Sequence, residues 1–150
     1  MYKKTIAVIK FIYLYLAYWL VGLSEEYFYI YKGNYLADLE KYSSAIKAYK
    51  KAQKEDELYS VYAAIGWCYA NLENNELALE NYRKAYEKIR RHDISIALAH
   101  LEMEHGEINQ CREVFESLKE DRSDLPSDSQ KLYDKIQEFL SNSEMTNSSL

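Results

Sequence analysis

Residues 59–91 read YSVYAAIGWCYANLENNELALENYRKAYEKIRR, and this stretch decides the fold. Its apolar residues recur at helical spacing in two segments of about 13 residues, joined by a short turn. Small residues at Gly66 and Ala78 let two helices approach closely, and Tyr82 follows Ala78 by one turn on the same face. The stretch therefore predicts a pair of antiparallel helices.

The same pattern recurs in the window before this stretch and in the window after it. The interval from Gly33 to Gly66 equals the interval from Gly66 to Ala99, and we call this interval the repeat period. Small residues fall on small residues, and rings fall on rings. The matched sets are Gly33, Gly66 and Ala99; Ala45, Ala78 and Cys111; Tyr49, Tyr82 and Phe115; and Ala52 with Ala85. One helical hairpin cannot bury its own apolar stripe, whereas stacked hairpins can. The sequence thus predicts three hairpins over residues 26–58, 59–91 and 92–124.

This spacing resembles the tetratricopeptide repeat family. The second window carries the family's pattern at Tyr62, Ile65, Gly66, Tyr69, Ala78, Tyr82 and Ala85. The first window departs from it at Lys32, and the third departs at Glu102 and Leu118. The resemblance covers residues 25–124 and implies an all-α, tetratricopeptide-like solenoid, but it implies no particular activity.

The C-terminal residues read as a cap on the repeats. Within residues 125–140, apolar side chains at helical spacing predict an amphipathic helix that closes the open end of the stack. They are Leu132, Tyr133, Ile136, Phe139 and Leu140. The polar residues 141–150 are expected to be a disordered tail.

Residues 1–24 form a different kind of segment. From Ile6 to Leu23 only Lys10 is charged, so this segment predicts a hydrophobic helix just long enough to cross a bilayer. Lysines precede the segment and acidic residues follow it, which favours a single-pass membrane protein with a cytoplasmic N-terminus.

Two alternatives for this leader remain open. One is a signal peptide cleaved near Gly22-Leu23-Ser24, which would export the protein. The other is a core helix of a soluble, cytoplasmic protein, covered by the repeats, by a partner or by self-association.

Residues that carry chemistry are sparse. A net charge of −5 argues against nucleic-acid binding, and the four isolated glycines make no phosphate loop. His100 and His105 are five residues apart and do not share a helix face, so no metal site is expected. Cys68 and Cys111 are expected to be small buried residues. Without a convergent acid, base and nucleophile, we expect no catalytic residue, cofactor or small-molecule substrate, and hence no enzyme.

Acidic side chains on the predicted helices are interpreted as solvated. Glu102 and Glu104 in the third window are the main examples, and both are expected to lie on an exposed face.

The resemblance does imply a binding groove, because the first helix of each repeat lines a concave surface in that family. Carried over by position, the groove comprises Tyr27, Tyr31, Asn34, Asp38, Trp67, Asn71, His100 and Met103. Tyr31 and Trp67 are the candidate anchors, since aromatic residues carry much of the energy of interfaces. The alternative for Trp67 is that its ring packs between repeats, because the residues around it are mostly apolar or small.

The function predicted from these features is that of a membrane-tethered adaptor that binds a peptide or helix of another protein and helps to assemble a larger complex. The alternative is a soluble chaperone or regulator whose apolar N-terminal helix is buried by a partner or by self-association.

Overall fold

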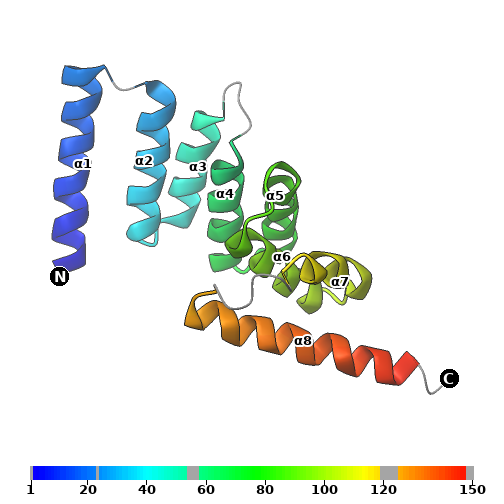
Figure 1. Cartoon of the computed structure of the whole chain (residues 1–150). Coiled ribbons are helices and arrows are strands. Elements are labelled where there is room, and N and C mark those ends of the chain that lie inside the picture. Colours follow the sequence, from blue (N-terminus) through cyan, green and yellow to red (C-terminus); the bar gives the residue numbers. More distant parts are fainter. Residues whose placement is uncertain (1, 23, 54–57, 119–124, 148–150) are drawn as a thin grey trace. The chain divides into compact units, whose positions relative to one another are not determined.

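A computed structural model of the chain describes residues 2–22, 24–53, 58–118 and 125–147, and every regular element in these ranges is a helix (Figure 1). The prediction of an all-α chain is thereby confirmed. The eight helices are α1 (Tyr2–Val21), α2 (Glu25–Asp38), α3 (Tyr42–Ala52), α4 (Tyr59–Asn71), α5 (Asn75–Lys88), α6 (His92–Glu104), α7 (Ile108–Glu116) and α8 (Ser127–Asn147). The predicted ends of the first and third repeats fall partly outside the described residues.

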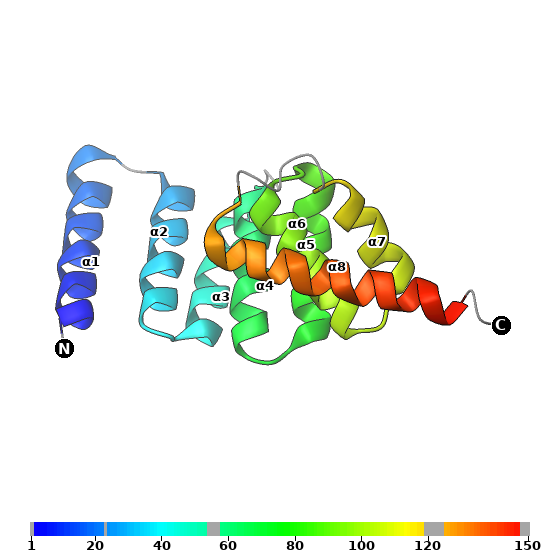
Figure 2. The same ribbon diagram turned by 60° about the horizontal axis from the view of Figure 1, so that its bottom comes forward.

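The chain divides into two compact units, residues 1–81 and 82–150, with the boundary inside α5. In the first unit α1 packs on α2, α2 on α3, and α3 on α4. In the second unit α6 packs on α7, and α8 packs on both (Figure 2). These pairings of consecutive helices are consistent with a helical repeat.

The turns between paired helices share one backbone geometry, which recurs with the repeat period. Glu40, Glu73 and Gly106 all have a positive φ, at 59°, 57° and 73°. In each turn the next amide donates to a carbonyl five residues earlier: Lys41 to Leu36 at 2.9 Å, Asn74 to Tyr69 at 3.0 Å, and Glu107 to Glu102 at 2.8 Å. This is the Schellman arrangement that ends many helices, and its recurrence follows the period read from the sequence.

Side-chain caps define the starts of two helices. The Ser24 hydroxyl accepts a hydrogen bond from the Tyr27 amide at 3.4 Å, directly before α2. The Asn74 Oδ1 accepts one from the Leu77 amide at 3.2 Å, directly before α5. Each cap satisfies an amide that has no partner within its own helix, so these positions fix where the helices begin.

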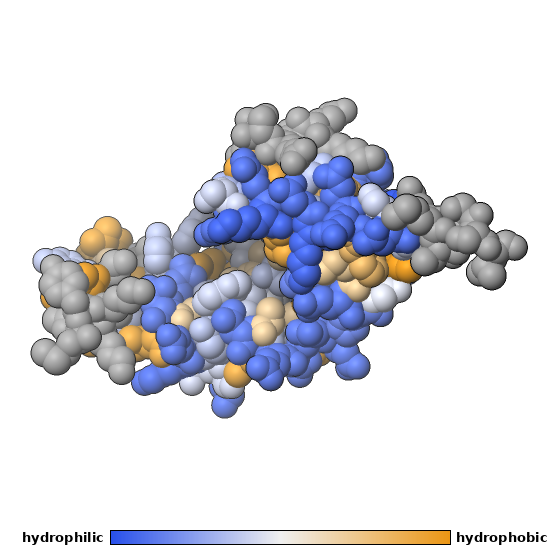
Figure 3. Space-filling model, turned by 90° about the horizontal axis from the view of Figure 1, so that it is seen from below, coloured by the Kyte–Doolittle hydropathy of each residue, from blue (hydrophilic) through white to orange (hydrophobic). Residues whose placement is uncertain are grey.

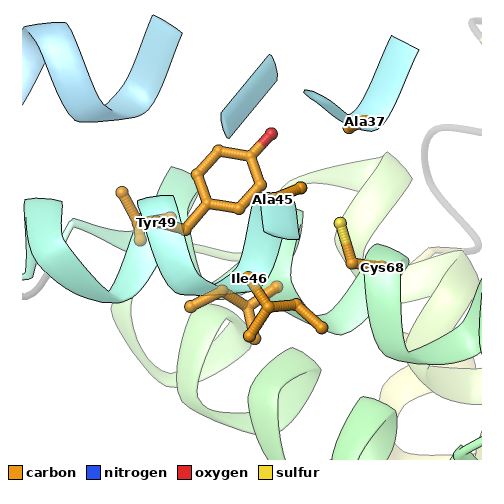
Figure 4. Close-up of a cluster of buried hydrophobic side chains, with 7 residues drawn as sticks. Ala37, Ala45, Ile46, Tyr49 and Cys68 are labelled. Atoms are coloured by element: carbon orange, nitrogen blue, oxygen red, sulfur yellow. The ribbon is translucent and has the colours of Figure 1, made fainter. Parts of the chain in front are cut away.

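The core of the first unit joins α2, α3 and α4. Its buried members are Ala37, Ala45, Ile46, Tyr49, Val61, Ile65 and Cys68. Figure 4 shows the Tyr49 ring directed from α3 toward α2. A side-chain carbon added at Gly33 would overlap that ring, with the ring Cζ only 2.8 Å away. The predicted close approach of small residue and ring is therefore present at this pair.

The core of the second unit places the matching residues in the same environment. Ala99, Cys111 and Phe115 are all buried. The Phe115 ring lies 4.5 Å from the ring of Tyr133, centroid to centroid, at an interplanar angle of 38°. Helix α8 thus contributes a ring to this core, and its role as the cap of a repeat stack stays a prediction.

Helix α8 continues to Asn147, seven residues beyond the end expected from the sequence. Its last turns are polar, and serine hydroxyls bond back to the helix: Ser141 donates to the Gln137 carbonyl at 2.9 Å and Ser143 to the Leu140 carbonyl at 2.7 Å. A polar composition alone did not mark the end of the helix, because residues 141–147 contain no glycine or proline to break it.

The prediction of a single-pass membrane protein with a transmembrane helix is wrong. Among the described residues, none of the helices combines the length and the apolar character that a bilayer crossing requires. Helix α1 ends at Val21, and Gly22 follows with a φ of 70°. The part of the apolar stretch that lies in α1 runs from Ile6 to Val21, about 24 Å at 1.5 Å per residue, against a hydrocarbon layer of about 30 Å.

Candidate functional site

One face of α2 gathers four of the predicted groove residues. Tyr27, Tyr31, Asn34 and Asp38 follow one another at intervals of four, three and four residues, which is the spacing of a single helix face. All four are exposed, whereas Gly33 on the opposite side is buried against α3. Tyr27 and Tyr31 each expose more than half of their surface, at 55% and 52%. The structure thus brings these four residues together at the surface of the first unit.

Helix α4 presents Trp67 and Asn71 at the corresponding positions. They lie one repeat period after Asn34 and Asp38, and both are exposed. The Trp67 ring is 44% exposed and meets the Tyr42 ring edge to face, with centroids 5.4 Å apart and an angle of 81°. Trp67 is therefore a surface residue supported on one edge. Tyr42 was not among the predicted residues, because its role depends on a contact between α3 and α4.

The two faces belong to one packed body. Ala37 of α2 and Cys68 of α4 are members of the same buried cluster, and their chain neighbours Asp38 and Trp67 are exposed. We call the exposed set the α2–α4 face. It consists of Tyr27, Tyr31, Asn34, Asp38, Trp67 and Asn71.

Both asparagines of the α2–α4 face are held by hydrogen bonds. The Tyr49 hydroxyl donates to Asn34 Oδ1 at 2.7 Å, and Asn71 Nδ2 donates to the Trp67 carbonyl at 2.8 Å. Burial raises the pKa of Tyr49, so its hydroxyl stays protonated and remains a donor. Asn34 is thereby oriented with its NH₂ group available to donate, and Asn71 with its carbonyl available to accept.

The predicted groove residues of the second unit behave differently. Met103 is buried, which leaves it little surface for a partner. His100 is half-buried, and its Nε2 lies 3.3 Å from both Glu104 Oε1 and Lys135 Nζ. The pKa of His100 is lowered, and burial of its ring is the main cause. Glu104, which lies one repeat period after Asn71, is the exposed residue of this turn.

The prediction that Glu102 lies on an exposed, solvated face is wrong. Its side chain is 2% exposed, and its Oε1 accepts from Nε and Nη2 of Arg83 at 3.3 and 3.2 Å. Arg83 also pairs with Glu107. Burial raises the pKa of Glu102, and its Oε2 has no hydrogen-bond partner. The repeat period matches Glu102 with Leu36 and Tyr69, which are partly buried against the core of the first unit, and this match is the signal that could have found the buried carboxylate.

The cysteines are confirmed as small buried residues. Cys68 and Cys111 are free thiols with no exposed surface. Burial raises the pKa of each to about 11, so both are protonated at neutral pH. A protonated, enclosed thiol is a poor nucleophile, and these residues serve packing.

No protein-family model matches the chain, and the search of curated proteins found none similar to it. The membership of the tetratricopeptide repeat family stays a prediction from the sequence spacing.

Proposed function

We propose that the chain is a tetratricopeptide-like protein-interaction module. Its task is to bind a peptide or helix of another protein on the α2–α4 face. The observation that carries this proposal is the presence of exposed rings and oriented amides on both helices: Tyr27 and Tyr31 with Asn34 on α2, and Trp67 with Asn71 on α4.

This chemistry suits a polypeptide ligand. Large rings bury much apolar area at a small cost in side-chain entropy, which is why Trp and Tyr dominate the energetics of interfaces. The asparagines offer one donor and one acceptor, the two groups that a peptide backbone needs. The face carries a single charged residue, Asp38, so the ligand is recognised mainly by apolar and hydrogen-bonding contacts rather than by charge.

The test begins with selection of ligands from random peptides displayed on phage, with the full chain as bait. Affinities of the selected peptides are then measured by calorimetry for the unmodified chain and for Trp67→Ala. We expect a loss of roughly 30-fold or more, the effect of removing a hot-spot ring. Tyr31→Ala is expected to weaken binding in the same direction.

The matched control is Lys47→Ala, which changes an exposed residue of α3 in the same unit. It is expected to leave the affinity unchanged, and circular dichroism is expected to be the same for all variants. Selected peptides that bind Trp67→Ala and Tyr31→Ala as tightly as the unmodified chain would overturn the proposal, as would a selection that yields no ligand.

A further inference from the structure

One face of helix α1 packs on α2. The remaining described side chains of α1 are exposed, and none of them is charged. The Tyr18 ring lies 4.7 Å from the ring of Phe28, centroid to centroid, and Leu14 and Ala17 are half-buried on the same side. Every exposed residue of α1 whose side chain is described is hydrophobic or aromatic. Figure 3 shows hydrophobic residues at the surface over this end of the first unit. A continuous apolar face of this kind marks an interaction site.

The exposed face contains a seam with the spacing of a coiled coil. Ile9, Ile12, Leu16 and Trp19 follow at intervals of three, four and three residues, and each is 47–69% exposed. We call these four residues the α1 seam. Apolar residues at alternating intervals of three and four are the pattern by which one helix packs along another, with side chains of one inserting between those of its partner.

The α1 seam is symmetric about position 14. Ile9 and Trp19 each lie five residues from that position, and Ile12 and Leu16 each lie two residues from it. When two copies of α1 lie antiparallel with their positions 14 at the same level along the helices, Ile9 of one faces Trp19 of the other, and Ile12 faces Leu16. Such a self-complementary surface is what an isologous dimer requires.

The charges at the two ends fit the same arrangement. Lys3 lies in the first turns of α1, and Glu25 lies in the first turn of α2, which begins four residues after the end of α1 at Val21. An antiparallel pair brings the lysine end of each copy beside the acidic end of the other. A parallel pair would place lysines beside lysines and acids beside acids.

We propose that α1 is a dimerisation helix that pairs antiparallel with α1 of a second copy of this chain through Ile9, Ile12, Leu16 and Trp19. The dimer covers the apolar face that α2 leaves exposed. This proposal rests on α1 and on the acidic first turn of α2, and it is independent of peptide binding on the α2–α4 face.

The first experiment is sedimentation of the full chain over roughly 1 to 100 μM, a range over which a dimer in exchange with its monomer changes its apparent mass. We expect a species of twice 17.8 kDa. Ile12→Glu should weaken the dimer by about 100-fold or more, because the two-fold axis places two unpaired charges in the contact. The matched control is Lys47→Glu, which places the same acid at an exposed position of α3 in the same unit. A chain that is monomeric throughout, or Lys47→Glu as disruptive as Ile12→Glu, would overturn the proposal.

The second experiment tests orientation by disulfide formation. Chains carrying Ile9→Cys are mixed with chains carrying Trp19→Cys and oxidised. The native Cys68 and Cys111 have no exposed surface and do not interfere. We expect the mixed disulfide to form faster than either homodisulfide. Faster formation of the Ile9→Cys homodisulfide would indicate a parallel pair and would overturn the antiparallel assignment.

Discussion

The hairpin α2–α3 and the hairpin α6–α7 share a backbone design and differ in what fills it. Both turns use the same type of hydrogen bond, and both hairpins bury a small residue at the matching position, Gly33 or Ala99. In α2–α3 the space beside Gly33 is filled by the Tyr49 ring. In α6–α7 the equivalent ring, Phe115, meets Tyr133 of α8.

A second difference concerns charge. Two residues before the last residue of the first helix, α2 has Leu36 and α6 has Glu102. Glu102 is buried beside Arg83. The repeat therefore keeps size, spacing and turn geometry within this chain, while the chemistry of single positions varies. This comparison teaches that the repeated feature is the close approach of two helices, and it predicts where each hairpin is most sensitive.

The largest effect is expected at Gly33. Gly33→Leu should destabilise the protein by about 3 kcal/mol or more, and Gly33→Ala by about 1–3 kcal/mol, because any side chain there overlaps the Tyr49 ring. Urea unfolding followed by circular dichroism measures the change as a shift in midpoint at constant slope.

The double variant Gly33→Ala with Tyr49→Leu is the control for this prediction. If overlap with the ring causes the loss, the double variant should be more stable than the sum of the two single changes implies. An ordinary exposed helical glycine would instead gain about 1 kcal/mol from replacement by alanine. A gain of that kind at Gly33 would contradict the close approach.

The second effect distinguishes the α6–α7 hairpin. Arg83→Met should destabilise the protein by about 2 kcal/mol, because it leaves the buried Glu102 without its charge partner and Arg83 itself is partly exposed. Glu102→Leu, which restores the residue type of Leu36, should be neutral or stabilising. Thermal unfolding is the measurement.

Arg91→Met is the matched control for Arg83→Met. Arg91 pairs with Asp93 at 3.0 Å, but both side chains are more than half exposed, so the loss should stay below about 1 kcal/mol. Equal effects of Arg83→Met and Arg91→Met would mean that burial of Glu102 contributes nothing to the pairing.

The sequence predicted those parts of the fold that depend on local spacing. The helix pairs, the buried columns such as Ala45 and Phe115, and the exposed face of α2 all follow from helical intervals and from the repeat period. The family membership and the binding role stay predictions. Spacing could not predict the contact of Tyr42 with Trp67, because that contact depends on how α3 and α4 pack.

Two predictions fail because they treat residues apart from the repeat period or from the helix that holds them. The charge of Glu102 suggests exposure to solvent, whereas its side chain is 2% exposed and its counterparts Leu36 and Tyr69 pack against a core. The prediction of a transmembrane helix uses the apolar residues from Ile6 to Leu23, whereas the helix ends at Val21. Met103, a predicted groove residue, matches Ala37 in the repeat period, and both are buried.

The left-handed turn residues Glu40 and Glu73 were not predicted either. Glycine is the residue that signals a left-handed backbone, and glutamate carries no such signal. Only the third turn, with Gly106, has the residue that its geometry favours.

The third prediction uses pH to sharpen the contrast at Glu102. Its pKa in the folded protein is raised above the ordinary value of 4.5 by burial, so the folded state holds this proton more tightly than the unfolded state. The stability that the protonated Glu102 side chain contributes is fully present below pH 4.5. It is lost as pH rises from 4.5 through the folded-state pKa. Glu102→Gln keeps the shape without the charge, and its stability relative to the unmodified protein should increase over that interval. Urea unfolding at a series of pH values is the measurement, and parallel pH profiles for the two proteins would contradict the raised pKa.

The smallest effects concern the three turns. Glu40 and Glu73 hold the left-handed backbone that Gly106 adopts without strain, so Glu40→Gly and Glu73→Gly should each stabilise by about 0.5–1 kcal/mol. Gly106→Ala should destabilise by about 1 kcal/mol, since space is open around it and only the backbone conformation opposes a side chain. Glu113→Gly, in the exposed face of α7, is the control and should lose about 1 kcal/mol. Melting temperatures compare all four. The same Glu→Gly change is thus expected to raise the stability in a turn and to lower it in a helix. A loss of stability in Glu40→Gly would show that a contact of the glutamate side chain outweighs the strain of its backbone.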